Sequence, residues 1–186
     1  DGAPLGAWCA RLPPLLSQVL RGAGIGHGQP GLSYQAPQQA LPLAQLILPT
    51  VLQQQLPALQ VLLAEGGIDT LLLRGPPSNG RTSLIAALAA AQGKGLLLLA
   101  APAVQDAALR ALAPALAALL RAVTVYTGSN DLPAPSHGNW QALLLDPHQG
   151  CEQLQAQRSL LLELPLPDLP QRTALWRSAL AELPPA

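Results

Sequence analysis

The spacing of apolar residues changes character near the middle of the chain. Before Gly66, the leucines at positions 52, 56, 59, 62 and 63 recur at helical spacing, and Gly66-Gly67 ends that run. After Gly66, short and continuous apolar segments alternate with longer segments of helical period. Continuous apolar segments of this length are typical of buried strands. We therefore predict that an α/β unit begins at Gly66.

The predicted strands of this unit are 68–75, 95–101, 122–128, 141–146 and 159–164, and the predicted helices are 82–92 and 104–121. Strands that are apolar throughout, and that are joined by crossovers, form a parallel sheet covered by helices on both faces. The expected fold class is therefore α/β with a parallel sheet.

The first 65 residues are expected to form a helical and linker segment. Residues 5–20 suggest a short helix that is interrupted at Pro13 and Pro14, and the glycine-rich run 22–31 is interpreted as a linker. No helix opening follows the glycines of that run, so a ligand-binding loop is the less favoured alternative.

The loop 75–82, GPPSNGRT, carries candidate chemistry. It matches G-x-x-x-x-G-K-[ST] at every fixed position except the lysine, which Arg81 replaces. Because the loop lies between a predicted strand and a predicted helix, its backbone N–H groups and the helix N-terminus can hold an anion together. The alternative interpretation is an ordinary strand-to-helix turn that is capped by Thr82 or Ser83.

Two segments resemble AAA+ ATPases. Residues 71–89, LLLRGPPSNGRTSLIAALA, resemble the Walker A segment, and residues 163–180, ELPLPDLPQRTALWRSAL, resemble the passage from the last core strand into the helical lid. The resemblance implies a five-stranded, three-layer αβα sandwich of the P-loop type at 66–170, with the start of the lid at 171–186. It also implies ATP or ADP with Mg²⁺ as cofactor, with Thr82 facing the metal. The implied nucleotide-binding residues are Gly75, Pro76, Pro77, Ser78, Asn79, Gly80, Arg81, Thr82 and Ser83.

The sequence departs from the family where the chemistry is carried out. Arg81 replaces the lysine that reaches the β- and γ-phosphates, and Ser78 stands where glycine is usual, so weak binding is expected. The third predicted strand should end in Asp-Glu, but 126–128 are Tyr-Thr-Gly. In the alternative assignment Asp146 ends the Walker B strand, and Pro147 then occupies the Glu position. On the favoured assignment Asp146 takes the place of the sensor 1 residue.

Asp146 and Arg158 are the candidate catalytic residues. Arg158 lies just before the last predicted strand, in the region from which AAA+ rings project an arginine finger, and a solvated arginine at a helix end is the alternative. Residues His137, His148 and Cys151 are not expected to form a zinc site, because only the last two are close in sequence. The stretch 129–131, Ser-Asn-Asp, is interpreted as a polar turn.

Composition narrows the choice of partners. The ten basic and ten acidic residues cancel and form no Lys/Arg cluster, so neither nucleic acid nor a membrane is an expected partner. The two cysteines, Cys9 and Cys151, suggest no disulfide framework, and no apolar stretch has spanning length, which together favour a soluble cytoplasmic protein. Hydrophobic residues make up 49% and charged residues 11% of the chain, which indicates that a neighbour covers part of the surface.

The favoured interpretation is a degenerate AAA+ nucleotide-binding module of a larger, possibly tandem, protein that contributes structure or regulation and hydrolyses ATP weakly or not at all. Its expected partners are other domains of the parent protein or ring neighbours in a homo-oligomer. Two alternatives stay open: an active remodelling ATPase that uses Asp146, and an interaction scaffold that binds no nucleotide.

Overall fold

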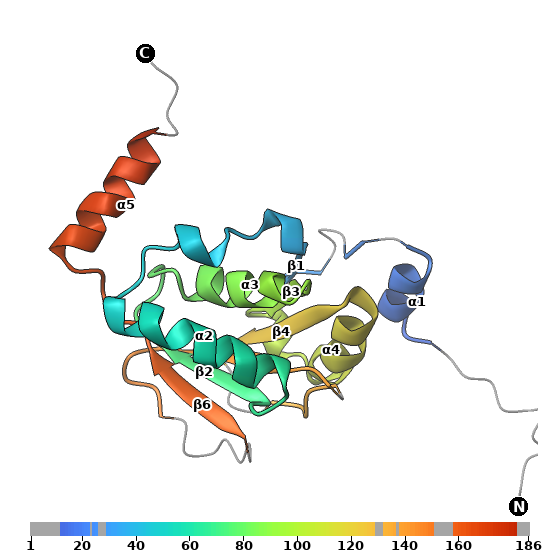
Figure 1. The fold of residues 1–186 in the computed structure, drawn as a ribbon. Helices are drawn as coiled ribbons and strands as arrows, with labels where there is room; N and C mark the ends of the chain where they lie inside the picture. Colours follow the sequence, from blue (N-terminus) through green and yellow to red (C-terminus); the bar gives the residue numbers. More distant parts are fainter. Residues whose placement is uncertain are drawn as a thin grey trace, which may run out of the picture.

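A computed structural model describes residues 12–22, 24–25, 29–128, 132–136, 138–150 and 158–181. Figure 1 shows helices and strands packed in layers, with one helix standing apart. The helices are α1 (Pro14–Leu20), α2 (Thr50–Ala64), α3 (Arg81–Ala91), α4 (Ala107–Leu120) and α5 (Leu169–Ala181), with short 3₁₀ helices η2 (Pro37–Gln39), η3 (Leu43–Gln45) and η4 (Ala103–Gln105). The strands are β1 (Leu32–Gln35), β2 (Thr70–Arg74), β3 (Gly95–Leu99), β4 (Ala122–Thr127), β5 (Gln141–Leu145) and β6 (Ser159–Glu163).

The strands form one sheet in the order β1-β3-β4-β5-β2-β6. The pairs from β3 to β6 are all parallel, which confirms the predicted α/β fold with a parallel sheet. The sheet has six strands where five were predicted, because β1 adds to β3 in antiparallel orientation. The absence of a side chain at Gly95 leaves room for the Tyr34 ring, which lies within 3.0 Å of where a Cβ would be.

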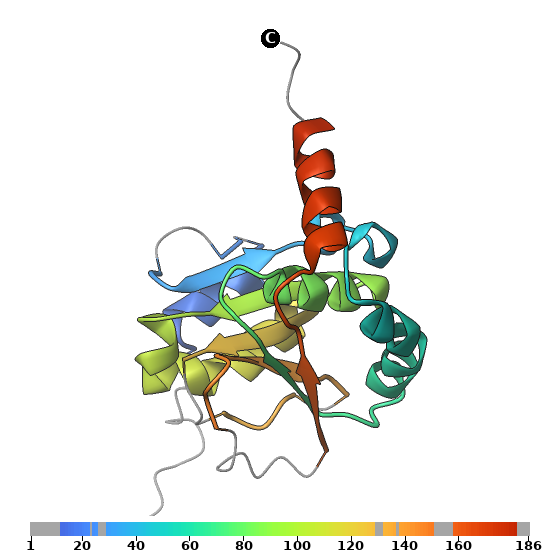
Figure 2. The ribbon, with the colours of Figure 1, turned by 90° about the vertical axis from the view of Figure 1, so that its left-hand side faces the viewer.

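Helices cover both faces of the sheet, as predicted. Helices α2 and α3 share one buried cluster with Leu71 and Leu73 of β2, whereas α1 and α4 share the other with Leu72. The alternation along β2 follows from the two-residue period of a strand, which turns successive side chains to opposite faces. Figures 1 and 2 show the resulting three layers from two sides.

The segment before Gly66 is less helical than its composition suggests. The helical spacing of leucines produces α2, in which Leu52, Leu56, Leu59 and Leu63 are buried. Between Pro37 and Pro49 the chain forms only η2 and η3, because prolines lack the N–H that a helix interior requires. Helix α1 begins at Pro14, and residues 5–11 of the predicted first helix lie outside the described residues.

Helix α5 extends away from the sheet in both views (Figures 1 and 2). Asp168 and Gln171 cap its N-terminus reciprocally, since each side chain accepts a bond from the other's backbone N–H. Four of its large apolar side chains are exposed, namely Leu169, Leu175, Trp176 and Leu180. That α5 opens a lid subdomain, separate from the core, stays a prediction.

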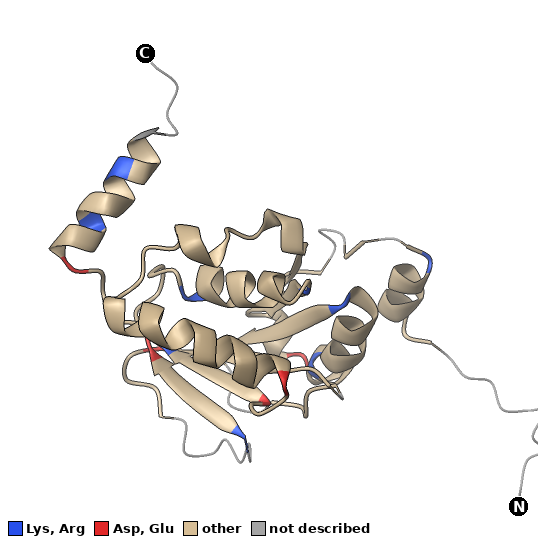
Figure 3. Cartoon of the chain, viewed as in Figure 1, with Lys and Arg blue, Asp and Glu red and all other residues tan. Residues whose placement is uncertain are grey.

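Among the described helices, none combines the length and apolar character needed to cross a bilayer. The positions of Lys, Arg, Asp and Glu are few and are spread over several elements of the described chain (Figure 3).

Candidate functional site

The loop from Gly75 to Gly80 joins the end of β2 to the start of α3, as predicted. Two of its residues have left-handed backbones, Ser78 with φ 60° and Gly80 with φ 89°. A left-handed conformation costs a non-glycine residue about 1–2 kcal/mol, so Ser78 is strained where glycine would not be. Gly80 precedes α3 with no side chain capping the helix, which differs from the alternative of an N-cap at Thr82 or Ser83.

Strands β5 and β6 hold this loop from two sides. The Leu145 carbonyl at the end of β5 accepts the Gly75 N–H at 3.1 Å, and the Leu164 carbonyl after β6 accepts Asn79 Nδ2 at 2.5 Å. A Cβ on Gly75 would lie within 3.0 Å of both the Leu164 oxygen and Asn79 Nδ2. The first glycine of the motif is therefore required by close packing of the loop.

The start of α3 leaves a cradle of unused donors. No hydrogen bond to another described residue uses the backbone N–H groups of residues 80–83. The same residues, with Ser78 and Leu144, line a hollow of about 280 Å³. Free N–H groups at a helix N-terminus attract anions, and the helix dipole adds to that attraction. The backbone of the loop therefore fits a phosphate group.

Arg81 lies at the inner wall of this hollow, and its side chain is only 9% exposed. Its Nη1 donates to the Leu145 carbonyl, and its Nη2 lies 3.7 Å from Asp146 Oδ1. The guanidinium that replaces the family's lysine is thus held against the end of β5. Asp146, by contrast, is 73% exposed, and its contact with the site among the described residues is this ion pair.

Among the described residues, the end of β4 carries no carboxylate. Residues 126–128 are Tyr-Thr-Gly, and Thr127 Oγ1 bonds to the Leu99 carbonyl at 3.4 Å. Tyr126 is fully buried, and burial raises the pKa of its hydroxyl, which keeps it neutral. Strand β5, which ends in Asp146, lies between β2 and β4 in the sheet.

Solved structures share the fold of this chain. A katanin chain, from work on katanin self-assembly, aligns over 97% of this chain and 69% of its own length, with a TM-score of 0.63 and 14% identity. PCH-2 of C. elegans aligns over 74% of this chain and 48% of its own, with a TM-score of 0.51 and 16% identity. At these identities the likeness shows a shared α/β fold.

Sequence comparison alone does not reach this result, since no family model and no curated protein matches the sequence. The likeness to the two structures therefore rests on backbone arrangement, since they share few identities with this chain.

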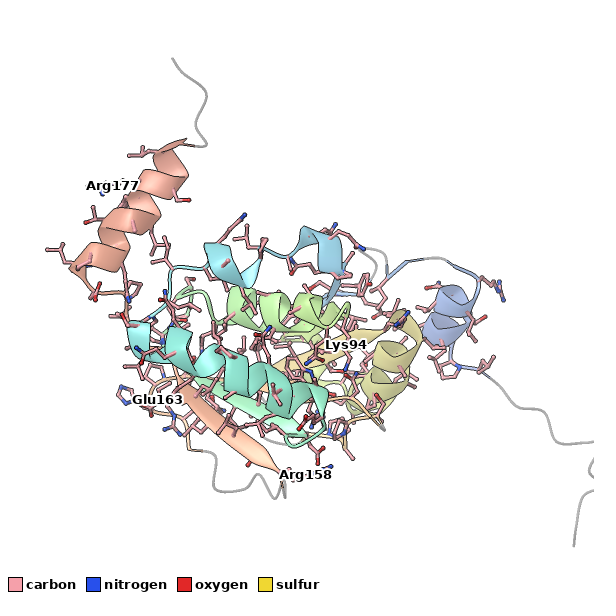
Figure 4. The ribbon with its side chains drawn as sticks, in the orientation of Figure 1. Lys94, Arg158, Glu163 and Arg177 are labelled. Atoms are coloured by element: carbon pink, nitrogen blue, oxygen red, sulfur yellow. The ribbon has the colours of Figure 1, made fainter. Side chains whose placement is uncertain are left out.

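Arg158, the candidate finger of the AAA+ resemblance, is engaged within its own chain. Its Nε and Nη2 donate to the two carboxylate oxygens of Asp69 at 2.8 and 2.7 Å, and its Nη1 donates to the Gly66 carbonyl at 2.7 Å. Figure 4 places Arg158 and Glu163 at opposite ends of β6, so Arg158 lies far along the strand from the phosphate loop. The structure does not bring Arg158 together with Asp146 or the loop.

A second ion pair beside the loop was not predicted from the sequence. Arg74, the last residue of β2, pairs with Glu163, the last residue of β6, with Nη1 and Oε1 3.3 Å apart. Arg74 and Glu163 line a hollow of about 730 Å³, together with Gly75 and Pro76. The opposite charges at the ends of two strands could have suggested the pair, but the strand order had to be known first.

The described residues contain no group of three or more His, Cys, Asp or Glu side chains that could hold a metal. His148 is described and exposed, whereas His137, Cys151, Cys9 and the turn 129–131 lie outside the described residues. Thr82 lines the hollow, and its predicted role toward Mg²⁺ stays a prediction. A magnesium site usually needs at least one carboxylate. The loop thus fits a phosphate through its backbone, but its side chains do not supply a set for Mg²⁺.

Proposed function

We propose that this chain is a degenerate AAA+ module that binds a nucleotide weakly through the backbone of the loop 75–83 and does not hydrolyse it. The observation that carries the proposal is the contrast between the loop and the end of β4. The N–H groups of residues 80–83 are free to bind phosphate, whereas β4 ends without a carboxylate.

Loss of hydrolysis follows from the missing groups. Hydrolysis needs a positioned base for the attacking water, and the absence of a base typically removes about 10²–10⁴ in rate. Asp146 would have to replace the metal carboxylate in the active-ATPase alternative. Its pairing with Arg81, and Pro147 directly after it, favour the non-hydrolysing module.

We further propose that the module acts as a structural or regulatory part of a larger ATPase assembly. The exposed apolar residues of α5 support this role, because a contiguous exposed apolar surface usually marks a contact with a neighbour. The likeness to a katanin chain from work on self-assembly points in the same direction. Ring neighbours or other domains of a longer protein are the proposed partners.

Equilibrium titration with a fluorescent ADP analogue tests the proposal. We expect weak, saturable binding that unlabelled ADP reverses. Arg81→Lys should bind more tightly, by an amount on the order of the 1.5–3 kcal/mol of a charged hydrogen bond, because a compact ammonium reaches the phosphates better than a guanidinium held on β5. Absence of binding in both folded proteins would favour the nucleotide-free scaffold instead.

A further inference from the structure

The proposed nucleotide site already contains a fixed cation. The Arg81 side chain is 9% exposed, and it is anchored by the Leu145 carbonyl and by Asp146 Oδ1. A guanidinium has five N–H donors, so these contacts leave donors that can face the hollow that Arg81 lines. Its charge is permanent, since arginine stays protonated in proteins.

The carboxylates near the carboxyl ends of the strands all have partners in the described part of the chain. Asp146 lies beside Arg81, and Glu163 pairs with Arg74. Asp106, before α4, accepts the N–H groups of Ala108 and Leu109 at 2.8 and 3.2 Å. Mg²⁺ binds through carboxylates and phosphates in octahedral geometry. The one side-chain oxygen of Thr82 is a poor substitute for such a set.

From these contacts we infer that the module binds nucleoside di- or triphosphates in their metal-free form, with Arg81 supplying the positive charge that Mg²⁺ supplies in an active site. The inference rests on the proposed function, since it concerns the same loop. Asp146 is then the anchor of Arg81 and not a metal ligand.

The test compares the affinity of the full chain for a fluorescent ADP analogue in MgCl₂ and in EDTA with NaCl at matched ionic strength. We expect the two dissociation constants to differ by less than tenfold. A site in which Mg²⁺ contributes a charged contact would lose about 1.5–3 kcal/mol without it. That loss corresponds to roughly tenfold or more in affinity. A difference of tenfold or more would overturn the inference and leave the proposed nucleotide binding intact.

Asp146→Asn tests whether this carboxylate anchors Arg81 or binds a metal. Glu65→Gln is the matched control, because Glu65 is an exposed carboxylate at the end of α2. If Asp146 anchors Arg81, the variant should change affinity by the same factor with and without Mg²⁺. A loss of binding confined to the magnesium buffer would contradict the inference. Absence of binding in every buffer would instead reject the proposed function, and the inference with it.

Discussion

Arg81 illustrates how one substitution changes the task of a residue. In an active phosphate loop a flexible ammonium reaches toward the ligand, whereas here a planar guanidinium is packed against β5. The position was recognisable from the sequence as a departure from the motif. Its contacts were not, because Leu145 and Asp146 are far from Arg81 in sequence and meet it only when β5 lies next to β2.

We predict that Arg81→Ala destabilises the fold. The change removes a hydrogen bond from a charged donor in a buried setting, which is worth about 1.5–3 kcal/mol. Arg177→Ala, on the exposed surface of α5 (Figure 4), is the matched control and should change stability by less than about 0.5 kcal/mol. Urea unfolding followed by circular dichroism measures both. Equal stability of the two variants would show that Arg81 is not a structural contact.

A second prediction concerns Gly75. A Cβ at this position would press on the Leu164 carbonyl and on Asn79, so Gly75→Ala should cost about 1–3 kcal/mol as an overpacked site. Gly150→Ala is its control, since no atom lies within 4 Å of a Cβ there. Thermal unfolding gives the comparison, and an unchanged midpoint for Gly75→Ala would mean that the loop is looser than described.

At the scale of elements, Arg158 joins three segments. Arg158 itself lies directly before β6. Its side chain bonds to Gly66, just after α2, and to Asp69, just before β2. The sequence suggested either an arginine finger or a solvated side chain, and neither interpretation included this contact. Both partners precede Arg158 by about 90 positions in the chain, so proximity in sequence could not reveal them.

We predict a coupling of about 0.5–1 kcal/mol between Arg158 and Asp69 in a double-mutant cycle with alanine, a modest value because the Arg158 side chain is 57% exposed. Arg158→Lys should recover only part of it, because an ammonium cannot engage both carboxylate oxygens and the Gly66 carbonyl as a fork. Zero coupling in unfolding experiments would return Arg158 to consideration as a finger that acts on a neighbouring subunit.

The elements themselves were largely predictable. Each apolar run after Gly66 became a strand whose bounds differ from the prediction by at most two residues, since a buried strand must be apolar on both faces. Strand β1 was missed because LSYQ carries no such run and pairs with Leu96–Leu99 of β3, which lie far from it in sequence. Strand β6 is the other edge of the sheet, and its apolar run made it predictable. An apolar run thus identifies a strand at the centre or at the edge, whereas a strand without such a run is missed.

At the scale of the whole molecule, the sheet and its covering helices bury their apolar faces, but α5 does not. Trp176 is 68% exposed and Leu180 60% exposed on a helix that stands away from the sheet (Figure 2). The low share of charged residues in the sequence indicated a covered surface. Which element carries it could not be known before the position of α5 was seen.

We therefore predict that the chain associates at high concentration through α5. Replacing Leu175 and Trp176 by serine should shift sedimentation toward the monomer and reduce binding of an apolar dye, since both side chains are exposed. Leu12→Ser, at an exposed leucine before α1, is the control and should not alter either measurement. A monomeric parent chain that binds no dye would contradict the prediction.

The central claim is that the loop binds a nucleotide that the module cannot hydrolyse. Equilibrium dialysis against radiolabelled ATP, followed by separation of ATP from ADP in the protein compartment, measures both parts in one sample. We expect label to accumulate with the protein, to be displaced by unlabelled ATP, and to be recovered as ATP at the level of a protein-free blank. Recovery as ADP that disappears in Asp146→Ala would contradict the account, and so would a failure of the label to accumulate at all.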